Sequence, residues 1–493
     1  MTSPYSITDA DWQPSQPQPV PLKFSNFVTV CSGLMFLLCL MVLIETHLSS
    51  SALKRFAVPE SALEIVTSQV MLLQEGLHQI PDWEREVTEV IGETGSDLPQ
   101  FISWYEELTG FVTDPRSQFY LAILEGEAGR LDEVQAKAEQ WESQSSPYSW
   151  YSQFLDAAYL LDNVDEAPAQ VLQSQLAELV PSGWFYSRVA MRIAVRSEDL
   201  ELKAAVEENL ARRGNQLATY NRVLSLIQGA CFVVGLLSLG VLFWRWRSYR
   251  WEGLRVGEAV LPPPWSGWHG LIVMIRGGGL SSLVVISIFL ALSVVGLGQN
   301  ILQFLIPFAI HLPVLFLAYL YLWNRHGLSV RDALGLHVIP GGWVPMGLLT
   351  FGLFAIGSAG GWVVSLVAEM THASFHWTDW FDQTLIQGDM QQLILPLISY
   401  TLLAPIFEEL VFRGILFSTL RRQLGPWTSI IISAAVFSFA HGYGSVGSIS
   451  IFLSGILWAW AYEKSGSVLP GMAAHALNNS LVCLTVLLMI RPA

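Results

Sequence analysis

The stretch PIFEELVFRGILFSTLRR, residues 405–422, carries two adjacent glutamates and an arginine inside strongly apolar sequence. On an α-helix, side chains three or four positions apart share a face, so Glu409 and Arg413 can pair along one stripe. Glu408 lies about 100° around the helix from Glu409 and can point elsewhere. An ionisable residue inside a membrane helix is costly and usually marks a working site. This helix is therefore the first candidate for chemistry.

The composition around this stretch is that of a polytopic membrane protein. The chain has 493 residues, of which 52% are hydrophobic and 14% charged, and its mean hydropathy is +0.43. Nine apolar runs predict transmembrane helices, so the expected fold class is all-α and polytopic. The last four runs are short and carry polar residues, which predicts that some of them tilt or lie inside the bundle. The expected spans are 27–44, 223–244, 280–298, 301–323, 343–367, 393–417, 428–440, 449–462 and 472–490.

Residues 51–220 have a different character, with 28 acidic and 12 basic residues. Apolar residues recur there at helical spacing, and Asp114-Pro115 has the pattern of a helix start. Gly129-Arg130 predicts a tight turn between two helices, and further helices are expected at 150–161, 170–179, 184–195 and 200–213. The repeated helical hairpins resemble a tetratricopeptide-like solenoid, although an irregular helical bundle fits the pattern equally well.

This acidic insert contains no catalytic constellation, so binding or sensing through a protein partner is its expected role. Nucleic acid is excluded as a partner because the soluble part has no basic stripe. The four cysteines all lie in apolar runs, so no disulfide framework is expected.

The charge pattern also predicts the orientation of the chain in the membrane. Four arginines, interleaved with tryptophans, follow the second span, and basic residues beside a span mark its cytoplasmic side. The N-terminus is then cytoplasmic, residues 49–220 are extracytoplasmic, and the chain is a multi-pass protein of the plasma membrane. The expected domains are a disordered tail (1–22), a first transmembrane helix (23–48), the acidic helical domain (49–220), a second transmembrane helix with a basic Trp-rich loop (221–268), and a membrane domain (269–493).

Three more polar residues lie in the last apolar helices. FSFAH ends at His441, and AHALNN places His475 and Asn479 on one helical face. A carboxylate in a partly dehydrated pocket, such as Glu408, is a usable general base. A neutral imidazole can orient a water molecule or bind a metal, and a His–Asn pair can donate hydrogen bonds to an oxyanion. The combination predicts peptide hydrolysis, with these four residues as the catalytic group.

Each residue also has a structural interpretation. Glu409 and Arg413 can form a buried ion pair without catalytic work, and a histidine on an apolar face, such as His311, is more often a core residue. Asn479 can join two helices through its amide. A non-catalytic membrane scaffold or a proton-relaying transporter would use the same residues, although no inverted repeat is evident. The occurrence of the polar residues on three separate apolar helices favours a functional site.

These motifs resemble those of the CPBP family of intramembrane proteases. EELVFR (Glu408 to Arg413) is similar to its EExxxR motif, FSFAH (437–441) to FxxxH, and HALNN (475–479) to HxxxN. The family includes CAAX prenyl endopeptidases and bacteriocin-processing, bacteriocin-immunity and abortive-infection proteins. The resemblance covers roughly residues 280–490 and does not reach the acidic insert.

The resemblance implies a role for each matching residue. Glu408 would be the general base and would activate water together with His441. His475 and Asn479 would stabilise the oxyanion. The substrate would be a membrane-associated protein or peptide, and the chain would be an endopeptidase.

The remaining motif positions, Glu409, Arg413 and Phe437, would support this group. The family is commonly labelled metalloprotease, and a metal such as zinc would be held by Glu408 and the two histidines. A metal-free mechanism with a glutamate-activated water is equally consistent with the motifs, and the chain has no HExxH sequence.

Overall fold

The computed structural model describes residues 23–48, 58–82, 84–85, 98–249, 265–295, 299–339, 341–371, 376–379 and 381–492, together with residues 53, 56 and 373. The predicted tail at 1–22 and most of the predicted basic loop lie outside these residues. The regular elements within the described ranges are all helices. The chain divides into a membrane unit (residues 1–51, 227–379 and 388–483) and an insert unit (52–226, 380–387 and 484–493).

Seven helices in the described part of the chain are long and apolar enough to cross a membrane. Two shorter apolar helices, Asn26–Val42 and Pro426–His441, correspond to the other two predicted spans. Seven candidate spans are therefore established by length and composition, and the count of nine stays a prediction. The seven are Leu200–Arg245, Gly267–Ala291, Phe304–His326, Trp343–Met370, Ile394–Arg421, Ser445–Ser465 and Leu469–Ile490.

The second predicted span is part of a much longer helix, α10, which runs without a break from Leu200 to Tyr249. The sequence predicted a separate helix that ends at Arg213. The helix continues through Gly214, since a single glycine costs a helix only about 1 kcal/mol. This glycine lies against Gly76 of α2 (Pro59–Leu77), where an added Cβ would come 2.8 Å from the Gly76 nitrogen. A glycine in mid-helix is thus retained for close helix packing rather than as a stop.

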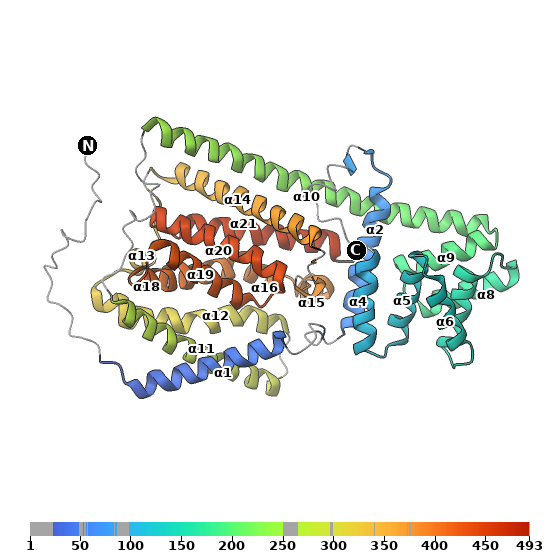
Figure 1. The fold of residues 1–493 in the computed structure, drawn as a ribbon, viewed down its shortest axis with the longest axis horizontal. Helices are drawn as coiled ribbons and strands as arrows, with labels where there is room; N and C mark the ends of the chain where they lie inside the picture. The colour runs from blue at the N-terminus through green and yellow to red at the C-terminus, as the bar shows by residue number, and fades with distance from the viewer. Residues whose placement is uncertain are drawn as a thin grey trace. The chain divides into compact units, whose positions relative to one another are not determined.

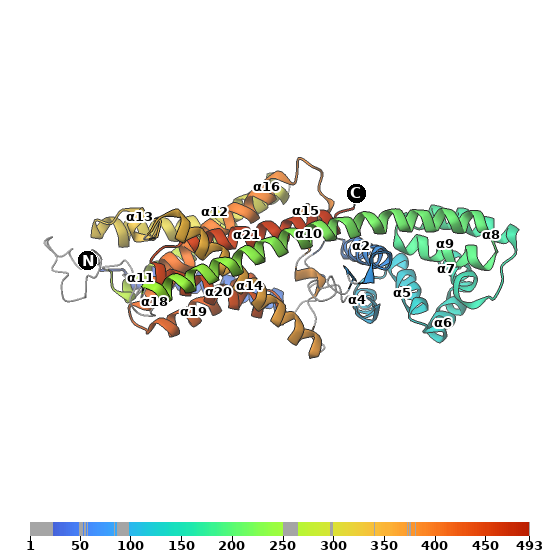
Figure 2. The ribbon, with the colours of Figure 1, turned by 90° about the horizontal axis from the view of Figure 1, so that it is seen from above.

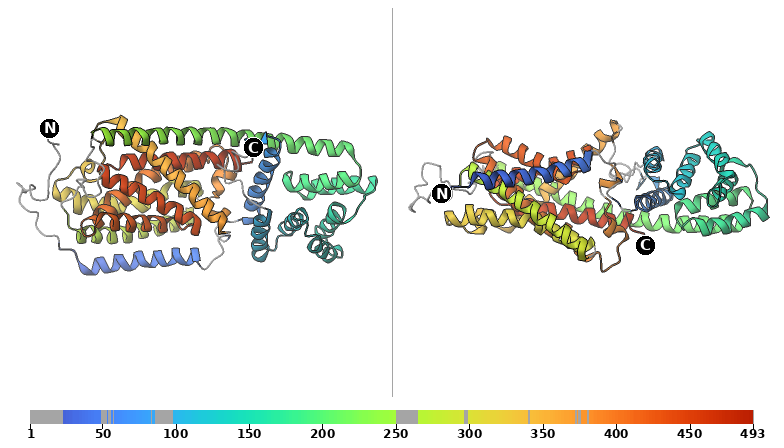
Figure 3. Two further views of the ribbon diagram at one scale, coloured as in Figure 1. Left: turned by 45° about the horizontal axis from the view of Figure 1, so that its top comes forward. Right: turned by 90° about the horizontal axis from the view of Figure 1, so that it is seen from below.

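The long helices of the membrane unit run side by side (Figure 1). α1 (Asn26–Leu48) packs along α11 (Gly267–Val295), which in turn packs on α12 (Gln299–Ala318) (Figure 3). Arg276 of α11 secures the start of α1, since it donates to the Ser25 carbonyl (2.7 Å) and the Thr29 hydroxyl (3.0 Å), with its guanidinium 4.7 Å from the Phe24 ring centre. A partly exposed polar anchor thus joins two otherwise apolar helices.

The candidate span Ile394–Arg421 contains the stretch with the two glutamates. Its short α-helical part with Glu408 and Glu409 is flanked by π-helical turns, which often occur at functional sites. Its first turns lie beside α12 (Figure 2). Along this span the elements are α16 (Ile394–Ile398), η7 (Ser399–Leu403), α17 (Ala404–Glu409), η8 (Leu410–Phe417) and α18 (Ser418–Arg421). The other elements of the unit are η4 (Tyr319–Trp323), η5 (Asn324–His326), α13 (Val330–Ala333), α14 (Trp343–Met370), η6 (Trp377–Asp379), α19 (Pro426–His441), α20 (Ser445–Ser465) and α21 (Leu469–Thr485).

The insert unit consists of short helices. The predicted helix start is confirmed: α5 (Pro115–Glu127) begins at its proline, and Asp114 accepts a 2.8 Å hydrogen bond from the Ser117 backbone. The predicted turn at 129–130 joins it to α6. The tetratricopeptide-like repeat stays a prediction. The unit also contains α4 (Leu98–Phe111), α6 (Leu131–Glu142), α7 (Tyr148–Leu155), η2 (Asp156–Leu160), α8 (Glu166–Leu179), α9 (Trp184–Arg196), α15 (Gln383–Gln387) and η9 (Val486–Ile490).

A buried carboxylate holds three of these helices together. Glu127 ends α5 and is 6% exposed, and it accepts hydrogen bonds from Arg188 (2.7 Å), Arg192 (3.1 Å) and the Tyr159 hydroxyl (3.0 Å). Burial opposes its ionisation, but the hydrogen bond from Arg192 and the charges of both arginines outweigh burial and lower the pKa of Glu127. Every donor comes from another element, so the network is a cross-link.

Candidate active site

The Glu409–Arg413 pair predicted from the sequence is formed and is fully buried. Arg413 Nη1 lies 2.8 Å from Glu409 Oε1, and each side chain is 1% exposed. Arg413 also donates a 3.4 Å hydrogen bond to the Gly455 carbonyl of α20, and its guanidinium lies 4.2 Å from the Phe437 ring centre. The ion pair therefore ties the glutamate helix to α19 and α20 as well as neutralising a buried charge.

His475 shares the same carboxylate oxygen. Its Nδ1 lies 3.3 Å from Glu409 Oε1, and because an ionised carboxylate only accepts, the nitrogen must carry the proton. This contact fixes the tautomer and turns Nε2 toward the other glutamate, where it lies 3.9 Å from Glu408 Oε2. Glu409 is thus an orienting partner of His475 as well as the partner of Arg413.

His441 reaches Glu408 in a similar manner. Its Nδ1 donates a 2.8 Å hydrogen bond to the Phe437 carbonyl one turn earlier on α19, and its Nε2 lies 3.7 Å from Glu408 Oε2. Both histidines therefore use Nδ1 to hold their rings and direct Nε2 at one oxygen. The structure brings together three predicted residues from α17, α19 and α21.

The oxygen at the centre of this group, like Oε2 of the neighbouring Glu409, has no direct hydrogen-bond partner among the described residues. Glu408 Oε2 is buried, and it makes no direct hydrogen bond to any described residue, although the carboxylate is 17% exposed. A buried acceptor in this state normally has a donor within about 3 Å. A water molecule at hydrogen-bonding distance from Glu408 can also reach either imidazole across separations of 3.7 and 3.9 Å. The geometry suits a carboxylate that binds and polarises water.

Asn479 stands apart from this group. It lies one turn after His475 on α21, but its amide nitrogen donates a 3.0 Å hydrogen bond to the Tyr400 carbonyl of η7. Its side chain therefore links α21 to the start of the glutamate helix. Its predicted role at an oxyanion stays a prediction.

Aromatic rings enclose the buried side of the site. Phe437, a predicted supporting residue, meets His441 edge to face at 4.6 Å and His475 at 6.0 Å between ring centres. Trp458 of α20 stacks on His475 at 4.2 Å. Sequence reasoning did not select Trp458, because an apolar helix rich in tryptophan has no local pattern that marks one ring as a contact of a distant histidine.

His311 of α12 also lies near the glutamate. It is buried, donates through Nδ1 to the Pro307 carbonyl at 2.7 Å, and lies parallel to the Phe407 ring at 5.9 Å. A histidine on an apolar face is expected to be a core residue, and the hydrogen bond of His311 within its own helix agrees with that expectation.

A carboxylate and two imidazoles are ligands that zinc accepts. Within the described ranges, however, no group of three or more His, Cys, Asp or Glu side chains has the arrangement of a metal site. Glu408, His441 and His475 as placed do not form a metal-binding cluster, so no step below is assigned to a metal.

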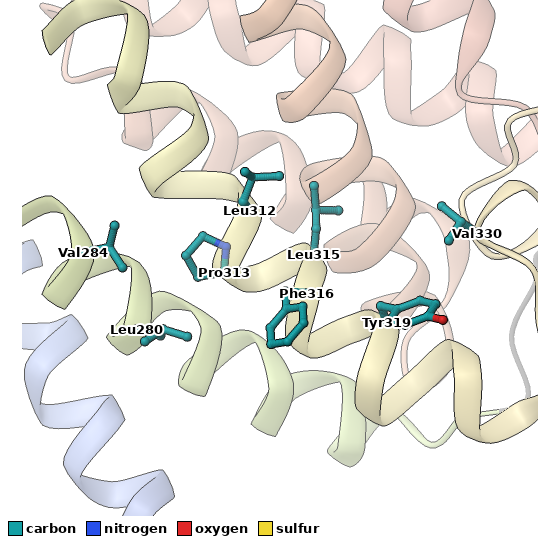
Figure 4. A pocket seen from close by; sticks show the side chains of 8 residues that line it. All are labelled: Leu280, Val284, Leu312, Pro313, Leu315, Phe316, Tyr319 and Val330. Atoms are coloured by element: carbon teal, nitrogen blue, oxygen red, sulfur yellow. The ribbon is translucent and has the colours of Figure 1, made fainter.

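An apolar recess of about 570 Å³ lies between α11 and α12 (Figure 4). Its wall is almost entirely hydrocarbon, with Tyr319 as the one residue that has a polar group. None of the candidate catalytic residues lines it. The recess is formed by Leu280, Val284, Leu312, Pro313, Leu315, Phe316, Tyr319 and Val330.

The sequence that carries the glutamate and the two histidines matches a known family. Residues 390–481, which contain all three motifs, match the family model described as type II CAAX prenyl endopeptidase Rce1-like. This segment is an Rce1-like domain. No curated protein and no solved structure matches the chain. The Rce1-like domain begins just before α16 and ends within α21, so it includes α17, α19 and α20 and leaves out α11, α12 and the acidic insert.

Proposed function

We propose that the chain is an intramembrane endopeptidase in which Glu408 activates the water that attacks a peptide bond. The observation that carries the proposal is the buried, unbonded Oε2 of Glu408 between the Nε2 atoms of His441 and His475. The Rce1-like domain supports an endopeptidase of the CAAX type. The substrate is a membrane-associated protein or peptide.

The first step is attack of water on the scissile carbonyl. Glu408 takes a proton from the water, and His441 holds the water through its Nε2. The tetrahedral oxyanion that forms needs hydrogen-bond donors, which His475 and Asn479 would supply. The C–N bond then breaks, and the leaving amine takes the proton that Glu408 had accepted. Water is consumed, and one carboxyl and one amine terminus are formed.

His475 needs a proton on Nε2 to act as a donor in this step. Its Nδ1 proton is already held by Glu409 at 3.3 Å, so a second proton makes an imidazolium. The oxyanion that forms balances that charge, because the Glu409 carboxylate is already neutralised by Arg413. Arg413 holds the Glu409 carboxylate in position for both contacts.

The arrangement in the membrane follows the charge pattern of the sequence. We propose nine spans, an N-terminus in the cytoplasm of a plasma-membrane protein, and an extracytoplasmic insert. The insert would recruit a substrate or a protein partner through its acidic surface. Residues 51–220 contain 28 acidic and 12 basic residues.

The test compares membrane proteomes from cells that express the wild type or Glu408→Gln at equal levels, with newly formed peptide termini as the readout. The amide keeps the shape of the side chain but is no base. Termini that disappear in the variant support proteolysis and identify the substrate. Identical termini with the variant still present in the membrane would overturn the proposal in favour of a non-catalytic scaffold.

A further inference from the structure

Trp458 contacts two residues of the candidate site from a helix that contributes none of the three motifs. It lies on α20, is 7% exposed, and stacks on the His475 imidazole with ring centres 4.2 Å apart and planes inclined by 19°. The Arg413 guanidinium lies 5.2 Å from the centre of its ring. Trp458 therefore faces both partners of Glu409.

These contacts form a closed ring of four side chains. Glu409 Oε1 binds Arg413 at 2.8 Å and His475 at 3.3 Å, and Trp458 contacts Arg413 and His475 on the other side. A single hydrogen bond from Nδ1 leaves an imidazole free to swing about the N···O direction. A flat ring stacked on its face removes that freedom. The stack thus determines where the Nε2 atom points.

Gly471 allows this close packing. It lies on α21 one turn before His475, and an added Cβ would come 3.3 Å from the Trp458 Cβ and 3.4 Å from Glu409 Oε2. The contact with the Trp458 Cβ is tighter than most Cβ contacts, so a larger residue would force α20 and α21 apart by a few tenths of an ångström, whereas the distance to the carboxylate is an ordinary contact. α20 and α21 are thus fitted to each other where the ring of side chains closes.

We propose that Trp458 is a positioning residue whose indole face holds His475 so that Nε2 stays directed at the Glu408 carboxylate. The proposal rests on the proposed function for its catalytic consequence, but the geometry can be measured without any substrate. It predicts that a flat aromatic ring is required at position 458, and that apolar bulk alone is insufficient.

The geometric test uses full-length protein in lipid nanodiscs with isotope-labelled histidine. The His475 ε1 proton, assigned through its loss in His475→Gln, should be shifted upfield by the ring current of the stacked indole. Trp458→Leu should abolish that shift, and Trp458→Tyr should keep part of it. Trp323→Leu removes another buried indole of the same unit, 2% exposed against 7% for Trp458, and should leave the shift unchanged. An unaltered His475 resonance in Trp458→Leu would overturn the proposal.

The catalytic test counts the termini that depend on Glu408, normalised to the amount of folded protein in the membrane. Trp458→Leu should reduce them about tenfold, because small displacements of a catalytic group are costly. Trp458→Tyr and Trp323→Leu should stay within about twofold of the wild type. A purely structural role for Trp458 predicts no loss per folded molecule in Trp458→Leu either. Full cleavage by Trp458→Leu would refute the positioning role. If no terminus depends on Glu408, the proposed function fails, and the proposal is decided by the His475 resonance alone.

Discussion

Two partly buried glutamates, one in each unit of the chain, show how differently the same side chain can be used. Glu127 in the insert unit accepts hydrogen bonds from two arginines and a tyrosine, all between 2.7 and 3.2 Å. Glu408 in the membrane unit has an oxygen without a direct hydrogen bond, 3.7 Å from one imidazole and 3.9 Å from another. A satisfied carboxylate stabilises a fold, whereas an unsatisfied one can still react.

Glu409 lies between these two cases. It is as buried as a structural carboxylate and is paired with Arg413, yet its bonded oxygen also orients His475. A pairwise description as an ion pair is therefore incomplete. The membrane unit places a structural carboxylate directly beside a reactive one and connects the two through a histidine.

The largest expected effect is the loss of cleavage in Glu408→Gln. A general base contributes on the order of 10²–10⁴ in rate, so cleavage should fall at least a thousandfold if the base also holds the water. The thermal midpoint should move little, because no hydrogen bond of Oε2 to another residue is lost. Rates per folded molecule in nanodiscs test this, and a variant with more than a tenth of the wild-type rate would contradict it.

The second effect concerns the ion pair. Arg413→Met leaves the Glu409 carboxylate buried without its cation, and breaking a buried pair in this manner costs about 3–5 kcal/mol. The double variant Glu409→Gln with Arg413→Met removes both charges and should recover most of that stability without recovering cleavage, because His475 loses its orienting carboxylate. Thermal unfolding and cleavage of the three proteins separate the two roles. Recovery of cleavage in the double variant would show that Glu409 is only structural.

The third effect is that of Asn479. If its amide leaves Tyr400 to stabilise the oxyanion, Asn479→Ala should lower the catalytic rate constant by roughly 10²-fold, as for other oxyanion donors. If it only joins α21 to η7, the rate should change less than about threefold while stability falls. Separate measurement of kcat and KM on the identified substrate, together with thermal stability, distinguishes the two cases. The Asn479→Asp variant, which keeps the size but lacks the donor, serves as the second measurement.

The smallest effect is an acid dependence of the insert. The pKa of Glu127 is lowered in the folded state, so its contribution is present above the ordinary glutamate pKa of 4.5 and is lost as the pH falls through the lower, folded value. We therefore expect the protection free energy of the α9 amides, corrected for intrinsic exchange rates, to fall by about 1 kcal/mol as the pH drops below 4.5. The effect is small because Arg192 is partly exposed, so that solvent screens its charge. Glu127→Gln should be less protected at pH 7 and should lose this dependence. An equal acid response in both proteins would contradict the assignment.

Local features of the fold were accessible from the sequence. The pairing of Glu409 with Arg413 follows from their spacing, and the start of α5 follows from Asp114-Pro115. The break predicted after Arg213 was wrong, since α10 continues to Tyr249. The close packing of Gly214 on Gly76, which is distant in the sequence, is likewise a tertiary contact that local pattern does not reveal.

The site was accessible only as a set of residues. The three motifs identify Glu408, His441 and His475. The spacing within each motif does not determine which imidazole nitrogen faces which carboxylate oxygen. That geometry depends on the packing of α17, α19 and α21 and on the Nδ1 contacts that fix each ring. The bond of Asn479 to Tyr400 and the stack of Trp458 on His475 are likewise tertiary contacts between distant segments.

The most direct measurement compares substitutions of the two glutamates, Glu408 and Glu127. Glu408→Gln and Glu127→Gln would be purified in nanodiscs and assayed side by side for substrate cleavage and for amide protection in α9. We predict that Glu408→Gln loses cleavage and keeps full protection, whereas Glu127→Gln is less protected at pH 7 and still cleaves. Cleavage retained in Glu408→Gln, with the protein folded, would contradict the assignment of Glu408 as the reactive carboxylate.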